Sequence, residues 1–225
     1  MPAYLAKELK DYNDKNPNKK VFVRTFKDGD KLTASYCDEN GRDLSALSSL
    51  LSDESDRPHG KITAVSINPS DGICRNAYKI LVTEQTLSGW GPMLYDCILV
   101  LAGDRGVTPD RANITPEAVR VWQIYYNNRK SDVKTLPLDI NKSTPDPEDD
   151  CVSDHETFGV IGNPQLKEKG ILNIVNQVYY DSGIKTLSNL ESFGLVYKQK
   201  AKTEPSNLFE LYQSFLQEVR NIKYL

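Results

Sequence analysis

The segment from residue 78 to residue 103 limits the possible folds most, because a strand, a glycine turn and an apolar helix follow one another in it. Residues 78–85 are strand-like, and residues 86–91 form a short loop with glycine at positions 89 and 91. Pro92 suits the first position of a helix, and Gly103 suits its end. Between them, apolar residues recur at helical spacing: Leu94, Cys97, Ile98 and Leu101. The segment therefore predicts a central strand that turns directly into a buried helix.

A turn of this kind can place backbone N–H groups at the positive end of a helix, where they bind a phosphate or pyrophosphate. The same pattern also occurs in a tight strand-to-helix turn that binds no ligand. The turn by itself leaves both interpretations open.

The chain has 225 residues, which is enough for one domain with an extension or for two small domains. Its formal net charge of −3 gives no electrostatic attraction for nucleic acid, so we expect no nucleic-acid partner. No apolar run approaches the length of a membrane span, and the first residues lack the apolar core of a signal peptide. We therefore expect a cytoplasmic protein that does not associate with membranes.

The four cysteines, Cys37, Cys74, Cys97 and Cys151, have no paired spacing and form no C-x-x-C motif. They could form two disulfides, but a reducing cytoplasm favours free thiols. Possible metal ligands gather close to the last of them: Cys151, Asp154, His155 and Glu156. Zinc sites in proteins usually draw on two separated ligand pairs, and no second pair is visible in the sequence. We therefore predict free thiols and no metal site.

The order of the predicted elements indicates an α/β fold of the layered α+β type. A hairpin is predicted at Asp28 and Gly29, and a helix start at Thr115 and Pro116. Strands are predicted at residues 21–26, 32–37, 61–67 and 78–85, and helices at residues 3–12, 44–51, 92–102, 116–127 and 183–193. Residues 104–111 are predicted to be a polar loop, and residues 172–180 fit either a strand or a helix.

The composition divides the chain into three parts. Residues 1–140 form the predicted domain, and residues 141–156 form a solvated acidic loop or linker. Residues 157–225 form a C-terminal extension that packs on the same core and ends in an amphipathic helix.

Two motifs resemble those of the GNAT superfamily of N-acetyltransferases. The turn from Thr86 to Gly91 has the pattern T-x-x-G-x-G, similar to the Q/R-x-x-G-x-G/A turn with which that family binds the pyrophosphate of acyl-CoA. Ala118 and Trp122 occupy the positions of the family's A-x-x-x-Y pattern on a later helix. Residues 89–133 are also similar to uncharacterised GNAT-like proteins encoded by bacteriophages. The resemblance implies a mixed central sheet flanked by helices over the predicted domain.

The resemblance also implies an activity, the transfer of an acyl group from acetyl-CoA or another acyl-CoA to an amine of a small molecule or protein. The amine would attack the thioester directly, and Glu84 would be the candidate base. Tyr125 or Tyr126 would be the candidate acid. The backbone around the turn would bind the pyrophosphate through Leu87, Ser88, Gly89, Trp90, Gly91 and Met93. The other interpretation of Glu84 is a strand carboxylate that faces solvent.

The sequence departs from the family pattern at three positions. Thr86 stands where the family has Gln or Arg, and Pro92 removes a backbone donor beside the turn. Trp122 stands where the family has its acid tyrosine, and an indole N–H cannot protonate a leaving thiolate. These departures favour the alternative of a catalytically inactive GNAT-like phage protein that acts as a structural, virion or host-interaction module, in the host cytoplasm or in the virion.

Tyr95 lies in the first turns of the predicted helix after the glycine loop. It either faces a ligand groove or packs on the sheet. The sequence contains no G-x-S-x-G motif and no Walker-type phosphate loop, so neither a serine hydrolase nor a P-loop NTPase is indicated.

Overall fold

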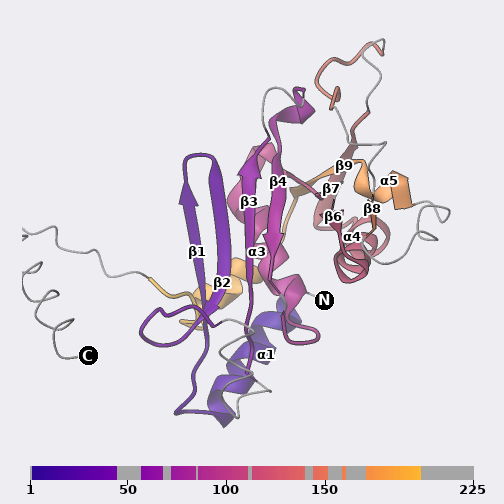
Figure 1. The fold of residues 1–225 in the computed structure, drawn as a ribbon. Coiled ribbons are helices and arrows are strands. Elements are labelled where there is room, and N and C mark those ends of the chain that lie inside the picture. Colours follow the sequence, from indigo (N-terminus) through magenta and orange to yellow (C-terminus); the bar gives the residue numbers. More distant parts are fainter. Residues whose placement is uncertain are drawn as a thin grey trace, which may run out of the picture.

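The structure is a computed structural model, and it describes residues 2–44, 57–67, 72–84, 86–110, 113–139, 144–151, 159–160 and 171–198. It is an α+β fold in which helices pack against a mixed seven-stranded sheet (Figure 1). The layered α+β class expected from the sequence is therefore confirmed.

The main sheet has the strand order β1-β2-β3-β4-β5-β9-β7. Its strands are β1 (Phe22–Asp28), β2 (Lys31–Cys37), β3 (Lys61–Ser66), β4 (Tyr78–Thr83), β5 (Val107–Thr108), β9 (Gln177–Asp181) and β7 (Val133–Pro137). Each neighbouring pair is antiparallel except β4 and β5, which run parallel. A second, small sheet pairs β6 (Asn113–Ile114) with β8 (Gly159–Val160).

The helices are α1 (Pro2–Lys15), α3 (Gly91–Ala102), α4 (Pro116–Asn128), α5 (Ile171–Val175) and α6 (Thr186–Ser192), with short 3-10 turns η2 (Cys74–Asn76) and η3 (Gly103–Arg105). Figure 1 shows α3 behind β3 and β4, and α4 beside β7 at the far end of the sheet from β1. Helix α3 is the centre of the core, because most of its side chains are buried, including Leu94, Cys97 and Ile98. Helices α1 and α6 pack against it.

Strands β4 and β5 pair only where they begin. The paired residues are Tyr78 with Val107 and Lys79 with Thr108, while β4 continues to Thr83. On the other side of β4 the register with β3 shifts by one residue, since Thr63 pairs with Val82 and Ala64 with Ile80. A bulge of this kind bends a strand and changes the direction of the residues after it. The second half of β4 therefore leaves β5, and the sheet opens at that end.

A fully buried carboxylate joins three helices. Asp96 of α3 is 0% exposed and accepts hydrogen bonds from Tyr125 Oη (2.7 Å), Arg129 Nη1 and Thr186 Oγ1. Arg129 also binds Asp132 at 2.5 Å. A buried charge is tolerated only when it is paired and hydrogen-bonded, so these contacts fix α4 and α6 against α3.

The prediction of four free thiols is wrong, because Cys74 and Cys151 form a disulfide across 77 residues of sequence. Cys37 and Cys97 are free and buried. The bridge ties η2 to the acidic segment 144–151, and Gly72 and Cys151 form a backbone bridge beside it. Contacts between segments so far apart in sequence leave no local spacing signal, which is why the cysteine pattern did not indicate the pair.

Several local predictions are confirmed. The hairpin at Asp28 and Gly29 forms, with Asp28 paired to Lys31. The α4 start also forms, since Thr115 Oγ1 accepts a hydrogen bond from the Ala118 amide at 3.3 Å.

Other segments differ from their predictions or lie outside the described residues. The predicted polar loop 104–111 contains β5, and residues 172–180 contain parts of both α5 and β9. Strand β9 comes from the predicted C-terminal extension, yet it lies inside the main sheet between β5 and β7. The acidic segment 144–151 is attached to the core rather than free. All but the first residue of the predicted helix 44–51 and all of the C-terminal amphipathic helix lie outside the described residues.

Replacing Asp96 with alanine should lower the free energy of unfolding by about 3–5 kcal/mol, because Arg129 would lose a buried partner and Thr186 and Tyr125 an acceptor. The matched control is Asp11→Ala, which removes an exposed pair with Lys7 and should cost less than about 1 kcal/mol. Urea unfolding followed by tryptophan fluorescence measures both. Equal effects of the two substitutions would contradict the role given to Asp96.

Replacing both Cys74 and Cys151 with serine should lower the free energy of unfolding by about 2–4 kcal/mol, since the bridge restricts the unfolded chain. A reducing agent should lower the stability of the natural protein by a similar amount and leave the double variant unchanged. Thermal unfolding with and without reductant tests this pair of outcomes. A natural protein that is insensitive to reductant would show that the bridge contributes nothing.

Candidate functional site

A cavity of about 700 Å³ opens where the second half of β4 leaves β5. The end of β4, the glycine turn and the first turns of α3 and α4 all contribute to its wall. The N-termini of two helices therefore face one cavity, and the positive ends of helix dipoles favour an anionic ligand.

The turn presents free backbone donors to this cavity. Gly89 has φ +88°, and a side chain added there would meet open space. The Trp90 amide donates to Leu87 O at 3.0 Å and closes the turn. Within the described part of the chain, the amides of Ser88, Gly89 and Gly91 donate to no protein acceptor. No side chain caps α3, so the start of this helix is open to a ligand.

The core holds the turn in this orientation from behind. Tyr36 Oη donates to Trp90 O at 2.8 Å, and the Trp90 ring makes edge contacts with Tyr12 and Tyr36. In a trans peptide the C=O and the following N–H point in opposite directions. Because Trp90 O points toward the core tyrosine, the Gly91 amide points away from it, on the side of the cavity that Gly91 lines.

The structure divides the six residues predicted to bind acyl-CoA into two groups. Ser88, Gly89 and Gly91 line the cavity. Leu87, Trp90 and Met93 do not line it; Met93 is fully buried, and Trp90 packs against the core through its ring. Met93 and the Trp90 ring therefore anchor the turn to the core.

Glu84 and Tyr95 line the same cavity. The Glu84 amide donates to Lys61 O at 2.9 Å, which continues the β3–β4 ladder and fixes the residue at the end of the sheet. Tyr95 comes from the second turn of α3, and its hydroxyl lies 3.3 Å from Thr83 Oγ1. Burial raises the pKa of Tyr95, and the hydrogen bond with Thr83 opposes part of that rise. A protonated phenol and a carboxylate therefore share one cavity.

The sequence left Tyr95 open between a ligand groove and the sheet; in the structure it lines the cavity, and its hydroxyl contacts Thr83 of β4 while its ring packs on α4. Its ring packs edge-on against Trp122 with 5.2 Å between centroids, while its side chain also lines the cavity. Trp122 itself is buried among the rings of Tyr125 and Tyr179. The residue at the family's tyrosine position is therefore part of the core.

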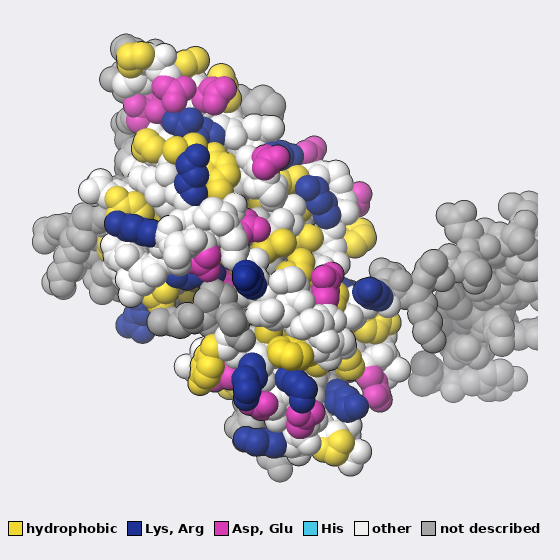
Figure 2. Space-filling model, turned by 180° about the vertical axis from the view of Figure 1, so that it is seen from behind, with side chains coloured by type: hydrophobic (Ala, Val, Ile, Leu, Met, Phe, Trp, Pro, Cys, Tyr) yellow, Lys and Arg dark blue, Asp and Glu magenta, His cyan; other side chains and the backbone are white. Residues whose placement is uncertain are grey.

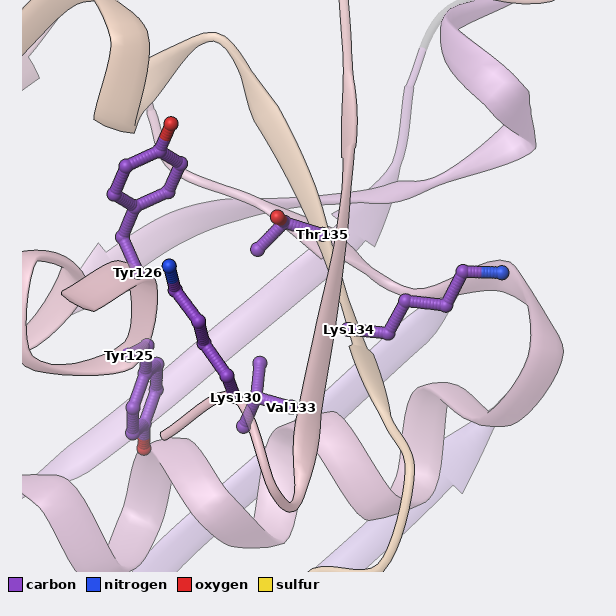
Figure 3. A pocket seen from close by; sticks show the side chains of 6 residues that line it. All are labelled: Tyr125, Tyr126, Lys130, Val133, Lys134 and Thr135. Atoms are coloured by element: carbon purple, nitrogen blue, oxygen red, sulfur yellow. The ribbon is translucent and has the colours of Figure 1, made fainter. Parts of the chain in front are cut away.

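The structure does not bring Tyr125 or Tyr126 to Glu84. Tyr125 is 1% exposed, and its hydroxyl contacts Asp96 Oδ1 and Pro92 O (3.2 Å). Burial and the neighbouring Asp96 carboxylate raise its pKa well above the usual value. Tyr126 lines a different cavity of about 300 Å³, where Figure 3 shows it with Lys130, while Lys134 extends away.

The charges around the main cavity are mixed. Arg120 of α4 lines it and supplies a cation beside the two helix N-termini, whereas Glu84 and Glu117 supply carboxylates. Such a cavity can hold a phosphate near Arg120 and a cationic amine near the carboxylates.

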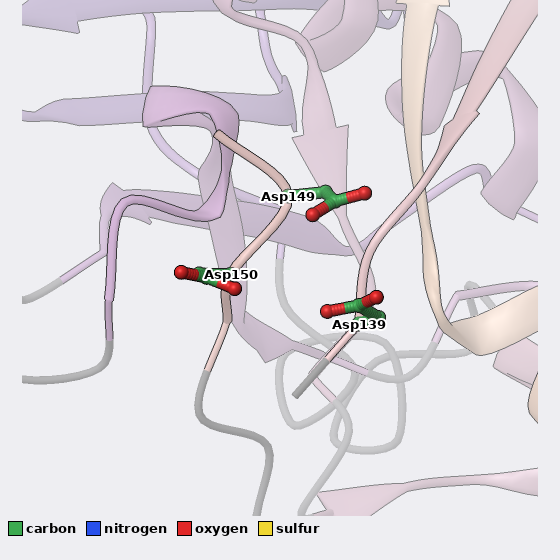
Figure 4. A group of neighbouring side chains, drawn as sticks. All are labelled: Asp139, Asp149 and Asp150. Carbon is green, nitrogen blue, oxygen red and sulfur yellow. The ribbon is translucent and has the colours of Figure 1, made fainter. Parts of the chain in front are cut away.

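The possible metal ligands noted around Cys151, for which the sequence predicted no metal site, cannot include that cysteine as a thiolate. Cys151 is bonded to Cys74, so its sulfur is not available, and residues 154–156 lie outside the described residues. A different acidic group, Asp139, Asp149 and Asp150, comes together instead (Figure 4). Asp139 lies ten residues before the adjacent Asp149 and Asp150, so no local spacing pattern in the sequence indicated this group.

No family model, curated protein or solved structure matches this chain.

None of the helices in the described part of the chain has the length and apolar character that crossing a bilayer requires.

Proposed function

We propose that this protein is a GNAT-like N-acyltransferase that transfers an acyl group from an acyl-CoA to an amine. The observation that carries the proposal is the open start of α3, whose unused turn amides face a cavity that also contains Glu84 and Tyr95. An anion-binding turn, a carboxylate and a protonated phenol in one cavity are the groups that such a transfer needs.

The opening between β4 and β5 supports this assignment. In sheets with parallel strands, ligands bind beyond the carboxyl ends of the strands, where neighbouring connections diverge. Strand β4 leads into α3 and β5 leads toward α4, and the two strands part after Lys79. The volume of about 700 Å³ is within the usual range for small-molecule sites.

The residues present fit the coenzyme. The amides of Ser88, Gly89 and Gly91 would hold the pyrophosphate, with the α3 N-terminus and Arg120 adding positive charge. Pro92 lacks an N–H, but at the first helical position it leaves the donors on either side of it in place. The thioester of acyl-CoA would supply an activated acyl group.

Glu84 would accept the proton that the attacking amine loses. Tyr95 would donate a proton to the departing sulfur, because a tyrosine hydroxyl is protonated at neutral pH and this one lines the cavity. We assign the acid role to Tyr95 rather than to Tyr125 or Tyr126, because Tyr95 lines the cavity with Glu84 and they do not.

Calorimetric titration with acetyl-CoA should give micromolar binding that Gly89→Glu weakens at least tenfold, because the new carboxylate would occupy the anion site. The matched control is Gly194→Glu, at another glycine with positive φ and open space around it but outside the cavity. It should carry the same backbone strain and bind acetyl-CoA normally. Absence of binding by the natural protein would favour the inactive structural or host-interaction module.

Glu84→Gln and Tyr95→Phe should each reduce acyl transfer by about 10²-fold or more while acetyl-CoA still binds. Tyr126→Phe serves as the control, because Tyr126 does not line the cavity and should leave the rate unchanged. Release of the coenzyme thiol in the presence of a panel of primary amines measures the rate. Full activity of both cavity variants would overturn the assigned roles.

A further inference from the structure

Two carboxylates from different elements line the main cavity. Glu84 follows β4 and is partly buried, and Glu117 lies in the first turn of α4 and is exposed. Within the described part of the chain, neither side chain forms an ion pair or a hydrogen bond. Lys61, which follows Glu84 in the β3–β4 ladder, binds Asp43 instead, at 3.4 Å. The fold therefore leaves the charges of both carboxylates uncompensated.

Arg120 is the one cationic side chain among the described residues that line this cavity. It follows Glu117 by three residues on α4, a spacing at which opposite charges can pair. No ion pair joins these two described residues. In the acyl transfer proposed above, Arg120 adds positive charge for the pyrophosphate. The two carboxylates are then left without a cation of their own.

The surroundings of the cavity do not supply the missing positive charge. The start of α4 carries a partial charge of about half a unit, which offsets only part of the charge of Glu117. Figure 2 shows acidic and basic side chains interspersed over the rear face of the molecule, with no broad field of one sign. The residues that line the cavity therefore decide which charges a ligand must bring.

Acyl transfer would occupy Glu84 and leave Glu117 without a role. As the amine attacks, a C–N bond forms and the C–S bond of the thioester breaks. Glu84 takes the proton that nitrogen loses, and Tyr95 gives a proton to sulfur. Tyr95 Oη lies 3.3 Å from Thr83 Oγ1, the residue before Glu84, so the reacting groups gather at the end of β4. Glu117 belongs to α4 and is free to bind another part of the acceptor.

We propose that the acceptor is a short aliphatic diamine and that Glu117 binds its second ammonium group; this inference rests on the proposed acyl transfer. The reacting amine would lie at Glu84, so each carboxylate would face one positive charge. Pro92, Ala118 and Val121 add apolar surface to the same cavity, which suits the methylene chain between the two amines. A monoamine would leave Glu117 unpaired in a cavity that also holds the anionic coenzyme.

Acyl transfer to 1,4-diaminobutane and to butylamine tests the inference, because these amines share one chain and differ by one amino group. The KM for the diamine should be at least fivefold below that for butylamine, and Glu117→Gln should bring the two KM values within about twofold. The matched control is Glu191→Gln, an exposed glutamate of α6 that does not line the cavity. It should keep the KM ratio of the natural protein.

Calorimetric titration with 1,4-diaminobutane in the absence of acyl-CoA tests the site apart from the chemistry. The natural protein and Glu191→Gln should bind the diamine with a Kd in the millimolar range or tighter, and Glu117→Gln at least fivefold more weakly. Equal KM values for the two amines in the natural protein would overturn the inference. Diamine binding that Glu117→Gln leaves unchanged, or no diamine binding at all, would overturn it too.

Titration with acetyl-CoA separates this inference from the proposed function. Diamine binding that depends on Glu117, without acetyl-CoA binding, would contradict acyl transfer and leave the diamine site standing. Acetyl-CoA binding with equal use of both amines would support acyl transfer and contradict the diamine site.

Discussion

The buried charge of Asp96 is the constraint on which the arrangement of helices depends. A carboxylate with no solvent exposure requires partners, and the chain supplies them from α4 and α6 through Tyr125, Arg129 and Thr186. Apolar contacts alone tolerate sliding and rotation of one helix on another, whereas directed hydrogen bonds to one carboxylate do not. The network therefore fixes where α4 lies relative to α3.

The cavity follows from that placement. Tyr125 contacts both Asp96 and Pro92 O, so the same side chain that satisfies the buried charge also reaches the first turn of α3. Tyr36 holds Trp90 O from the sheet side. Because Trp90 O is bonded to a core hydroxyl, the Gly91 amide of the same peptide points outward, toward the cavity. The predicted acid Tyr125 is thus a positioning residue, and the phenol that reaches the cavity is Tyr95.

The features predicted correctly from sequence are those with local causes. The Thr115 cap, the Gly103 helix end and the hairpin at Gly29 each depend on residues within one turn of the chain. Strand β5 has two residues in a polar segment, too few for a periodic signal. The choice between Tyr95 and Tyr125 depends on how α3 and α4 face each other, which the Asp96 network decides. A single sequence contains no comparable signal for such a contact.

Strand β4 separates from β5 at its end but must stay paired with it at its start. Beyond Lys79 the strand leaves β5, which creates a cavity at the cost of ladder hydrogen bonds. The beginning of the strand must therefore hold the sheet together. There, three consecutive residues, Cys74, Arg75 and Asn76, have positive φ, a conformation that costs about 1–3 kcal/mol per residue unless its surroundings enforce it.

The enforcing contacts are present at that end. The disulfide ties the strained turn to the acidic segment. Two backbone hydrogen bonds add to it, from the Cys74 amide to Asp150 O and from the Arg75 amide to Glu148 O. Arg105 donates to Asn76 O at 2.7 Å and stacks on the Tyr78 ring, just where β4 and β5 pair. Because covalent and charged contacts close the sheet at its start, β4 can diverge at its end without loss of the fold. The cavity at the end of β4 therefore depends on the disulfide and the hydrogen bonds at the start of the same strand.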